Sequence, residues 1–136
     1  MLDVGGEHYT GTLVLHPTRS QPTTITTQDG QTLKIYEIVD GQQRLTTLVI
    51  LLDAVRRELE TLPARKPLAD GIKKTYIVTH DTEDQKHVKL TLNSDTRAFF
   101  EHQVIADSGG TQSPTIQSSV RLAEAKQFFS DLLYAR

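Results

Sequence analysis

The sequence contains no cysteine, carries almost no net charge and has no long hydrophobic run. Without cysteine the chain cannot form disulfides, thiolate zinc sites or a cysteine nucleophile, and this composition suits a reducing compartment. Its longest unbroken apolar run, residues 48–52, is far shorter than the roughly 20 residues of a membrane helix. The N-terminal residues lack the basic and apolar regions of a signal peptide. We therefore expect a soluble cytoplasmic protein with no membrane contact.

The balance of charge and the length set further limits. Fifteen Lys and Arg residues against 17 Asp and Glu give a formal net charge of −2, so no global positive field indicates a polyanionic partner. The hydrophobic fraction of 37% is low, which predicts a lean core. A chain of 136 residues fits one domain. Within this single domain at 1–136 we expect strands and a motif helix at 1–62, a basic connector at 63–75, and short strands with two helices at 76–136.

Three short strands are predicted before residue 40. Alternating apolar side chains predict the first strand at residues 9–15. The segments 23–27 and 33–39 flank the tight-turn dipeptide Asp29-Gly30, and together they predict a hairpin.

Helical spacing replaces this alternation at residues 45–59. The apolar stripe there is wide, which predicts a helix buried between other elements. The elements expected beyond the proline-rich connector are short strands at 76–78 and 88–92 separated by a polar turn, a helix that begins after Asn93, a polar loop at 107–113, and a last helix capped by Ser118 or Ser119.

The junction of strand and helix at residues 37–48 is the most informative segment. Asp40 is a good N-cap, and Gln43 completes a capping box, so neither residue requires a ligand. Arg44 does require an explanation, because a cation in the first turn opposes the helix macrodipole by about 0.3–1 kcal/mol. A bound phosphate would compensate for it, since free amides and a guanidinium converge there. An ion pair from Arg44 to Glu37 or Asp40 is an equally open alternative.

The residues around this junction also resemble a known family. Residues 38–48 read Ile-Val-Asp-Gly-Gln-Gln-Arg-Leu-Thr-Thr-Leu and resemble the DGQQR signature of the N-terminal domains of GmrSD-type, modification-dependent restriction endonucleases. The similarity extends to residues 9–15 and 90–95, and to Phe99 and Phe100. It implies an α/β (α+β) fold with a small mixed, partly antiparallel sheet packed on helices, similar to ParB and sulfiredoxin. The family normally has an upstream strand and helix, so we expect an N-terminally truncated copy.

The resemblance implies an activity and a set of site residues. The expected activity is nucleotide binding and NTP hydrolysis within a bacterial anti-phage system that acts on modified DNA, with an HNH-type nuclease domain or subunit as partner. The expected cofactor is a nucleoside triphosphate with Mg2+. The phosphate-binding residues would be Gly41, Gln42, Gln43, Arg44, Thr46 and Thr47, and the catalytic residues would be Asp40, Gln42 and Gln43.

Asp40 would position a metal ion or water beside the phosphates, with no metal site formed by protein ligands alone. Two other functions stay open, namely a non-hydrolysing DNA-binding module gated by nucleotide and an inactive fragment.

A basic stretch follows the motif helix and is the best local candidate for a DNA-backbone contact, although a solvated face explains it equally well. Its members are Arg56, Arg57, Arg65, Lys66, Lys73 and Lys74. The five histidines show no spacing typical of metal ligands. We expect the chain alone to cut no DNA, to be marginally stable, and to self-associate through the edge of its first strand.

Overall fold

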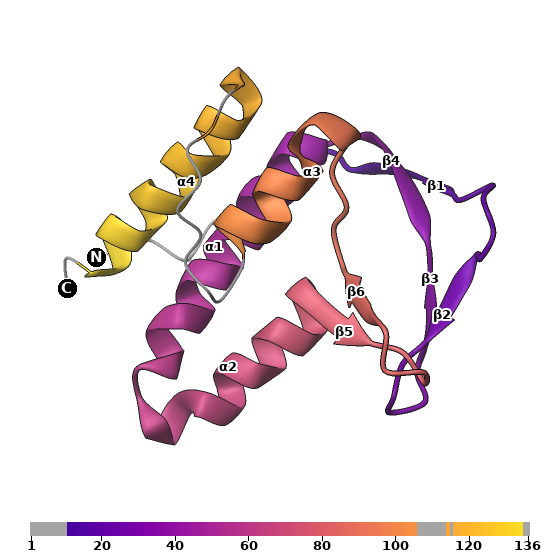
Figure 1. Ribbon diagram of the computed structural model, residues 1–136, viewed down its shortest axis with the longest axis horizontal. Coiled ribbons are helices and arrows are strands. Elements are labelled where there is room, and N and C mark those ends of the chain that lie inside the picture. Colours follow the sequence, from indigo (N-terminus) through magenta and orange to yellow (C-terminus); the bar gives the residue numbers. More distant parts are fainter. Residues whose placement is uncertain (1–10, 106–113, 115, 135–136) are drawn as a thin grey trace.

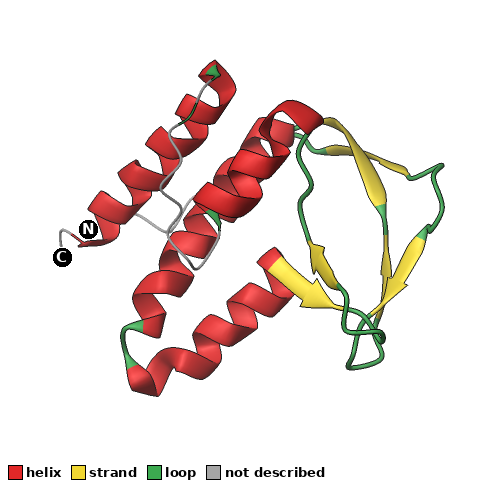
Figure 2. Cartoon of the chain, in the orientation of Figure 1, coloured by secondary structure: helices red, strands yellow, loops and turns green. Residues whose placement is uncertain are grey.

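The structure is a computed structural model that describes residues 11–105, 114 and 116–134 (Figure 1). The loop predicted at 107–113 and the first two residues of the strand predicted at 9–15 lie outside the described residues. Figure 2 shows helices gathered on one side of the molecule and short strands on the other. The predicted α/β class is therefore confirmed. Among the described residues, no helix has both the length and the apolar character that crossing a membrane requires.

The strands form three separate antiparallel ribbons in the described part of the chain, and not the single mixed sheet that was predicted. Strand β1 (Val14–Pro17) pairs with β4 (Tyr36–Asp40). Strand β2 (Thr24–Thr26) pairs with β3 (Thr32–Lys34), which confirms the predicted hairpin. Strand β1 begins and ends later than the strand predicted at 9–15, because residues 11–13 are not paired as strand and pairing with β4 continues to Pro17. A proline is tolerated there because β1 is an edge strand.

The third ribbon pairs β5 (Val78–His80) with β6 (Lys86–Val88). Both strands are displaced by about two residues from the predicted segments at 76–78 and 88–92. The reason is that the apolar residues which predicted these strands are buried in the core without pairing as strands. Ile77 is the last residue of a π-helical turn, η2 (Lys73–Ile77), and is 1% exposed. Leu90 and Leu92 are each 5% exposed, although both lie beyond the end of β6.

The central helix α1 (Gln42–Glu60) passes between the other helices, as its wide apolar stripe predicted (Figure 1). Its Val49 and Ile50 are buried in the main core. Two later helices complete this core: α3 (Ser94–Phe99), which continues into the π-helical turn η3 (Phe100–Val104), and α4 (Gln117–Tyr134).

The predicted start is confirmed for α3 but not for α4. Helix α3 begins directly after Asn93, as predicted. Helix α4 begins at Gln117, so Ser118 and Ser119 lie inside its first turn and neither caps it.

The segment 63–75, which was expected to be a basic connector, is helical. A 3-10 turn, η1 (Pro63–Arg65), leads into α2 (Lys66–Ile72), which packs on α1. Pro67 lies in the first turn of α2, where its missing N–H removes no helical hydrogen bond. Ala69 is completely buried, and this burial fixes α2 against its neighbours.

Candidate functional site

The site is built around the junction between β4 and α1. Strand β4 ends at Asp40, and Gly41 then adopts the left-handed conformation, with φ 97° and ψ 12°. Helix α1 begins at Gln42, and its start carries no side-chain cap. The predicted capping box of Asp40 and Gln43 is therefore wrong: Gly41 occupies the N-cap position, and Asp40 stays in the extended strand.

This junction leaves backbone donors at the start of a long helix. The first hydrogen bond of α1 runs from the amide of Leu45 to the carbonyl of Gly41, over 3.1 Å. The amides of Gln42, Gln43 and Arg44 precede that bond, so their N–H groups have no intrahelical acceptor. The positive end of the macrodipole of a 19-residue helix lies at the same place. The junction is therefore suited to an anionic group.

The chain segment ahead of β1 crosses closely over Gly41. A Cβ at this position would lie 3.0 Å from Leu13 Cδ1 and 3.1 Å from the carbonyl oxygen of Thr12. Glycine is thus required here twice, once for its positive φ and once for the close approach of a neighbouring backbone.

Arg44 binds that same segment. Its Nη1 donates a hydrogen bond of 2.9 Å to the carbonyl oxygen of Thr12, and a Cβ added at Gly11 would overlap its guanidinium. The structure shows no ion pair between Arg44 and any carboxylate of the described residues. The predicted alternative of a pair with Glu37 or Asp40 is therefore wrong. Arg44 instead ties the segment before β1 to the first turn of α1.

A cavity of about 320 Å³ opens on another face of the same helix start, between α1, α3 and α4. From α1 it is lined by Gln42, Gln43, Thr46 and Thr47. These four residues share one face of the helix, because positions one turn apart lie above each other. The other polar lining residues are Asn93, which directly precedes α3, Thr96 of α3, and Ser118 and Arg121 of α4.

The far wall of the cavity is apolar. Ile50 of α1 lies one turn beyond Thr46, and Leu122 and Ala125 of α4 line the same cavity; Leu92, just before α3, adds apolar surface nearer the helix starts. The cavity therefore has a polar end at the helix starts and an apolar end deeper among the helices. This division suits a ligand with one charged part and one less polar part.

The two threonine hydroxyls of the motif are already engaged as donors. Thr46 Oγ1 donates to the carbonyl of Gln42 over 2.7 Å, and Thr47 Oγ1 donates to the carbonyl of Gln43 over 2.9 Å. Their oxygen lone pairs remain, so this geometry suits acceptance of a hydrogen bond or coordination of a hard cation better than donation to phosphate.

The predicted site residues thus fall into two groups. Gln42 and Gln43 line the cavity together with both threonines, whereas Asp40, Gly41 and Arg44 lie outside its lining, toward the strands. Sequence reasoning missed Arg121, which comes from a helix more than seventy residues later in the chain. No local pattern marks Arg121, because a charged residue beside the apolar positions of a helix is common.

One family model matches the chain over almost its whole length. Residues 2–134 match the family model described as the GmrSD restriction endonuclease, N-terminal domain. The chain belongs to this family. The predicted resemblance is confirmed, and this GmrSD N-terminal domain is a component of a restriction system. No curated protein matches the chain.

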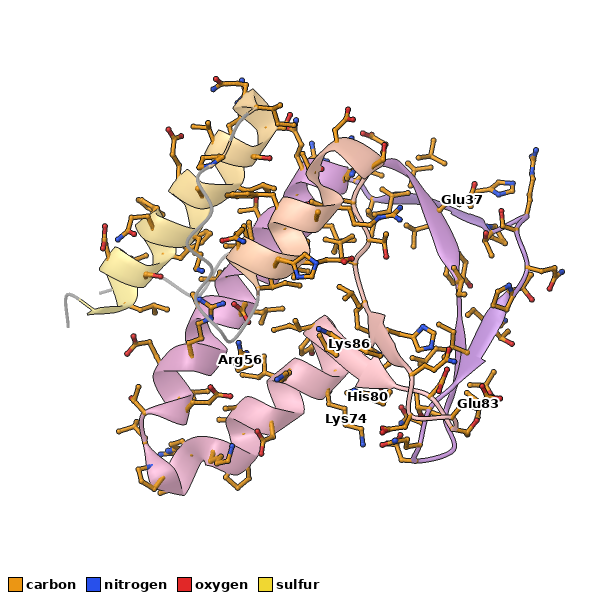
Figure 3. All side chains as sticks on the ribbon, viewed as in Figure 1. Glu37, Arg56, Lys74, His80, Glu83 and Lys86 are labelled. Atoms are coloured by element: carbon orange, nitrogen blue, oxygen red, sulfur yellow. The ribbon has the colours of Figure 1, made fainter. Side chains whose placement is uncertain are left out.

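In this GmrSD N-terminal domain the predicted basic stretch is divided between core and surface. The side chain of Arg56 is 0% exposed; Nε and Nη2 both donate to Asp53 Oδ1, at 2.9 and 2.7 Å, and Nη1 donates to Glu60 at 2.9 Å (Figure 3). Arg57 pairs with Asp53 at 3.0 Å and donates to the carbonyl of Val104. Burial therefore contradicts the predicted place of Arg56 on a DNA-contacting surface.

The other four residues of this basic stretch lie at or near the surface of the domain. Arg65, Lys66 and Lys74 are exposed, and Lys73 is half-buried. Lys74 forms an ion pair of 2.8 Å with Asp29, and this contact holds the pKa of that carboxyl at about 2. Lys66 forms a longer pair, of 3.5 Å, with Asp70. Acidic neighbours thus offset part of the positive charge on this surface.

Proposed function

We propose that this GmrSD N-terminal domain binds and hydrolyses a nucleoside triphosphate within a restriction system that acts on modified DNA. The observation that carries the proposal is the cavity of about 320 Å³ beside the uncapped start of α1, with Gln42 and Gln43 of the DGQQR signature in its wall. This volume lies at the lower end of the range typical for small-molecule sites. Free amides at a helix start are a recurrent phosphate-binding arrangement.

Each motif residue has a role in this proposal. The amides of Gln42 and Gln43 donate to phosphate oxygens, and the left-handed conformation of Gly41 sets the direction in which these amides point. Arg44 donates one guanidinium N–H to the carbonyl oxygen of Thr12, and this hydrogen bond fixes the orientation of its planar group. The other guanidinium N–H groups stay available to phosphate.

A magnesium ion fits this donor set only together with the nucleotide. Among the described residues, no three histidine or carboxylate side chains lie close enough to hold a metal ion. Mg2+ is commonly held by one or two carboxylates and by substrate phosphates, and Asp40 is the carboxylate that directly precedes the motif glycine. The oxygens of Thr46 and Thr47 are further candidate ligands. When bound, the ion would neutralise phosphate charge, while Asp40, Gln42 and Gln43 position the attacking water.

The test is phosphate release under multiple turnover with each nucleoside triphosphate and Mg2+, with and without modified DNA. We expect Asp40→Asn to bind nucleotide as the wild type does and to release phosphate at least about 100-fold more slowly. Asp95→Asn is the matched control, because Asp95 is an exposed carboxylate in the first turn of α3, outside the cavity lining. Full hydrolysis by Asp40→Asn would reject the role of Asp40. Absence of nucleotide binding by the wild type would reject the proposal.

A second candidate function is a DNA-binding module that uses nucleotide as a conformational ligand without turnover. It is favoured by one observation, that the described residues lining the cavity include no carboxylate. Tight nucleotide binding with no phosphate release, together with DNA affinity that depends on nucleotide, would select this function. Neither binding nor release would indicate an inactive fragment.

The DNA contact belongs to the same proposal. Arg65, Lys66, Lys73 and Lys74 would contact the DNA backbone, and an HNH-type nuclease domain or subunit would cut it. Replacing Arg65 and Lys66 by glutamine should weaken DNA binding similarly for all sequences and lower its salt dependence, because phosphate contacts carry no sequence information. An unchanged salt dependence would show that this surface is only solvated.

A further inference from the structure

The cavity contains one charged residue that the DGQQR motif does not supply. Among the described residues that line it, Arg121 is the only charged one, and the other polar members are neutral amides and hydroxyls. Arg121 is exposed, and it makes no ion pair or side-chain hydrogen bond with another described residue. A lining with one cation and no carboxylate favours an anionic ligand.

The arrangement of the helices places this charge at the polar end of the cavity. Helices α1, α3 and α4 all begin at the same end of the helical layer (Figure 1). Arg121 lies near the start of α4, and the apolar lining residue Ala125 lies one turn further along the same helix. On α1 the same order holds, with Gln42 at the start and Ile50 two turns further. The polarity of the cavity therefore changes in the same direction on two long helices.

We infer that Arg121 is a phosphate-binding residue that α4 contributes to the site, and that the cavity fixes which way a nucleoside triphosphate lies. The phosphates lie between Arg121 and the start of α1, and the base packs against Leu122 and Ala125. This inference rests on the proposed nucleotide binding and adds to it a residue and an orientation. Arg121 approaches from the cavity side and Arg44 from the strand side, so two guanidiniums hold the phosphate chain from different directions.

The first arm of the test replaces the charge. Arg121→Gln, Arg121→Lys and the control Arg19→Gln are titrated calorimetrically with Mg2+ and each nucleoside triphosphate, and with inorganic tripolyphosphate. Arg19 is an exposed arginine in the loop between β1 and β2, so its replacement changes net charge equally. We expect Arg121→Gln to weaken nucleotide and tripolyphosphate binding by about 10-fold to 100-fold, Arg121→Lys to recover part of the loss, and the control to match the wild type.

The second arm tests the orientation of the nucleotide. Ala125→Leu adds volume at the apolar end, where the base is placed, and leaves the polar end unchanged. We expect this variant to bind nucleoside triphosphates at least about tenfold more weakly and tripolyphosphate as the wild type does. Equal weakening of both probes would overturn the orientation. Far-ultraviolet circular dichroism checks that each variant is folded.

The outcomes separate this inference from the proposal on which it rests. If the wild type binds nucleotide and folded Arg121→Gln binds it equally well, the role of Arg121 is overturned, while nucleotide binding at the motif stands. If the wild type binds neither nucleotide nor tripolyphosphate, both the proposed function and this inference fail.

Discussion

Replacement of Gly41 by alanine tests the geometry on which the site depends. Gly41 has a φ of 97°, in the left-handed region that alanine rarely adopts. An added methyl group would also meet Leu13 Cδ1 at 3.0 Å and the carbonyl oxygen of Thr12 at 3.1 Å. Two separable penalties therefore act at one position, one from the backbone of residue 41 and one from the segment that crosses over it.

Two other glycines allow these penalties to be measured separately. Gly30, in the turn between β2 and β3, has a φ of 85° but no atom within 4 Å of an added Cβ. Its replacement by alanine carries the backbone penalty of about 1–2 kcal/mol, partly offset by about 0.4–1 kcal/mol from the stiffer unfolded chain. Gly71 lies within α2 without a positive φ, and an added Cβ there also meets open space. Gly71→Ala should therefore stabilise by about 0.5–1 kcal/mol.

These comparisons give the expected magnitude at Gly41. The net loss at Gly30 is about 1 kcal/mol, and contact with the backbone of Thr12 and Leu13 adds about 1–3 kcal/mol, since a backbone yields less readily than the end of a side chain. We expect Gly41→Ala to lower the free energy of unfolding by about 2–4 kcal/mol, a substantial part of the stability of a small domain. The nucleotide affinity of the folded fraction should fall as well, because the amides of α1 shift.

The assay is urea denaturation of the wild type and the three alanine variants, followed by circular dichroism and analysed by linear extrapolation. The expected order of stability is Gly71→Ala above the wild type, then Gly30→Ala, then Gly41→Ala. Equal losses at Gly30 and Gly41 would show that no backbone packs over Gly41. That result would refute the close packing of residues 12 and 13 on the junction.

Three further predictions concern charged residues. Arg56→Ala should lower the free energy of unfolding by about 3–5 kcal/mol, because it leaves the buried carboxylate of Asp53 with less compensation, and a loss below about 1 kcal/mol in urea denaturation would contradict its burial. Asp29 has a folded pKa of about 2 against an ordinary value of 3.8, so its contribution is complete above pH 4 and is lost as the pH falls toward 2. The stability difference between wild type and Asp29→Asn should therefore shrink over that interval, and a difference independent of pH would show that the ion pair with Lys74 does not form. Arg44→Ala should cost about 1 kcal/mol of stability and at least about tenfold in nucleotide affinity, measured by titration; unchanged affinity of the folded fraction would leave Arg44 with a structural role only.

Local patterns in the sequence predicted the elements whose pairing is local. The β2–β3 hairpin follows from its turn dipeptide, and α1 follows from its apolar stripe. The pairing of Arg56 was also open to prediction, since Asp53 and Glu60 lie three and four residues away on the same helix. Reading the basic residues as one tract ignored those acidic neighbours. A run of basic residues on a helix predicts a positive surface only where no carboxylates lie three or four residues away to pair with them.

Features that depend on tertiary contacts were not predictable in this way. Leu90 and Leu92 alternate as strand residues do, yet the core buries them in an irregular segment beyond β6. Asp40 and Gln43 have the spacing of a capping box, but the left-handed Gly41 moves the helix start one residue along the chain. Arg121 reaches the cavity only because α4 packs on α1. No local signal connects residue 121 with residue 42.

The turn of the helix explains why one short motif serves two neighbouring structures. Successive residues of α1 point about 100° apart, so Gln42 and Gln43 face the cavity while Arg44 faces the segment before β1. Gly41, the residue before Gln42, packs closely against Thr12 and Leu13 of that same segment. A displacement of that segment would therefore act on Gly41 and Arg44 together, and through them on the amides at the start of α1. The affinity of the cavity for phosphate should consequently depend on what holds the segment before β1 in place, even though none of its described residues, 11–13, lines the cavity.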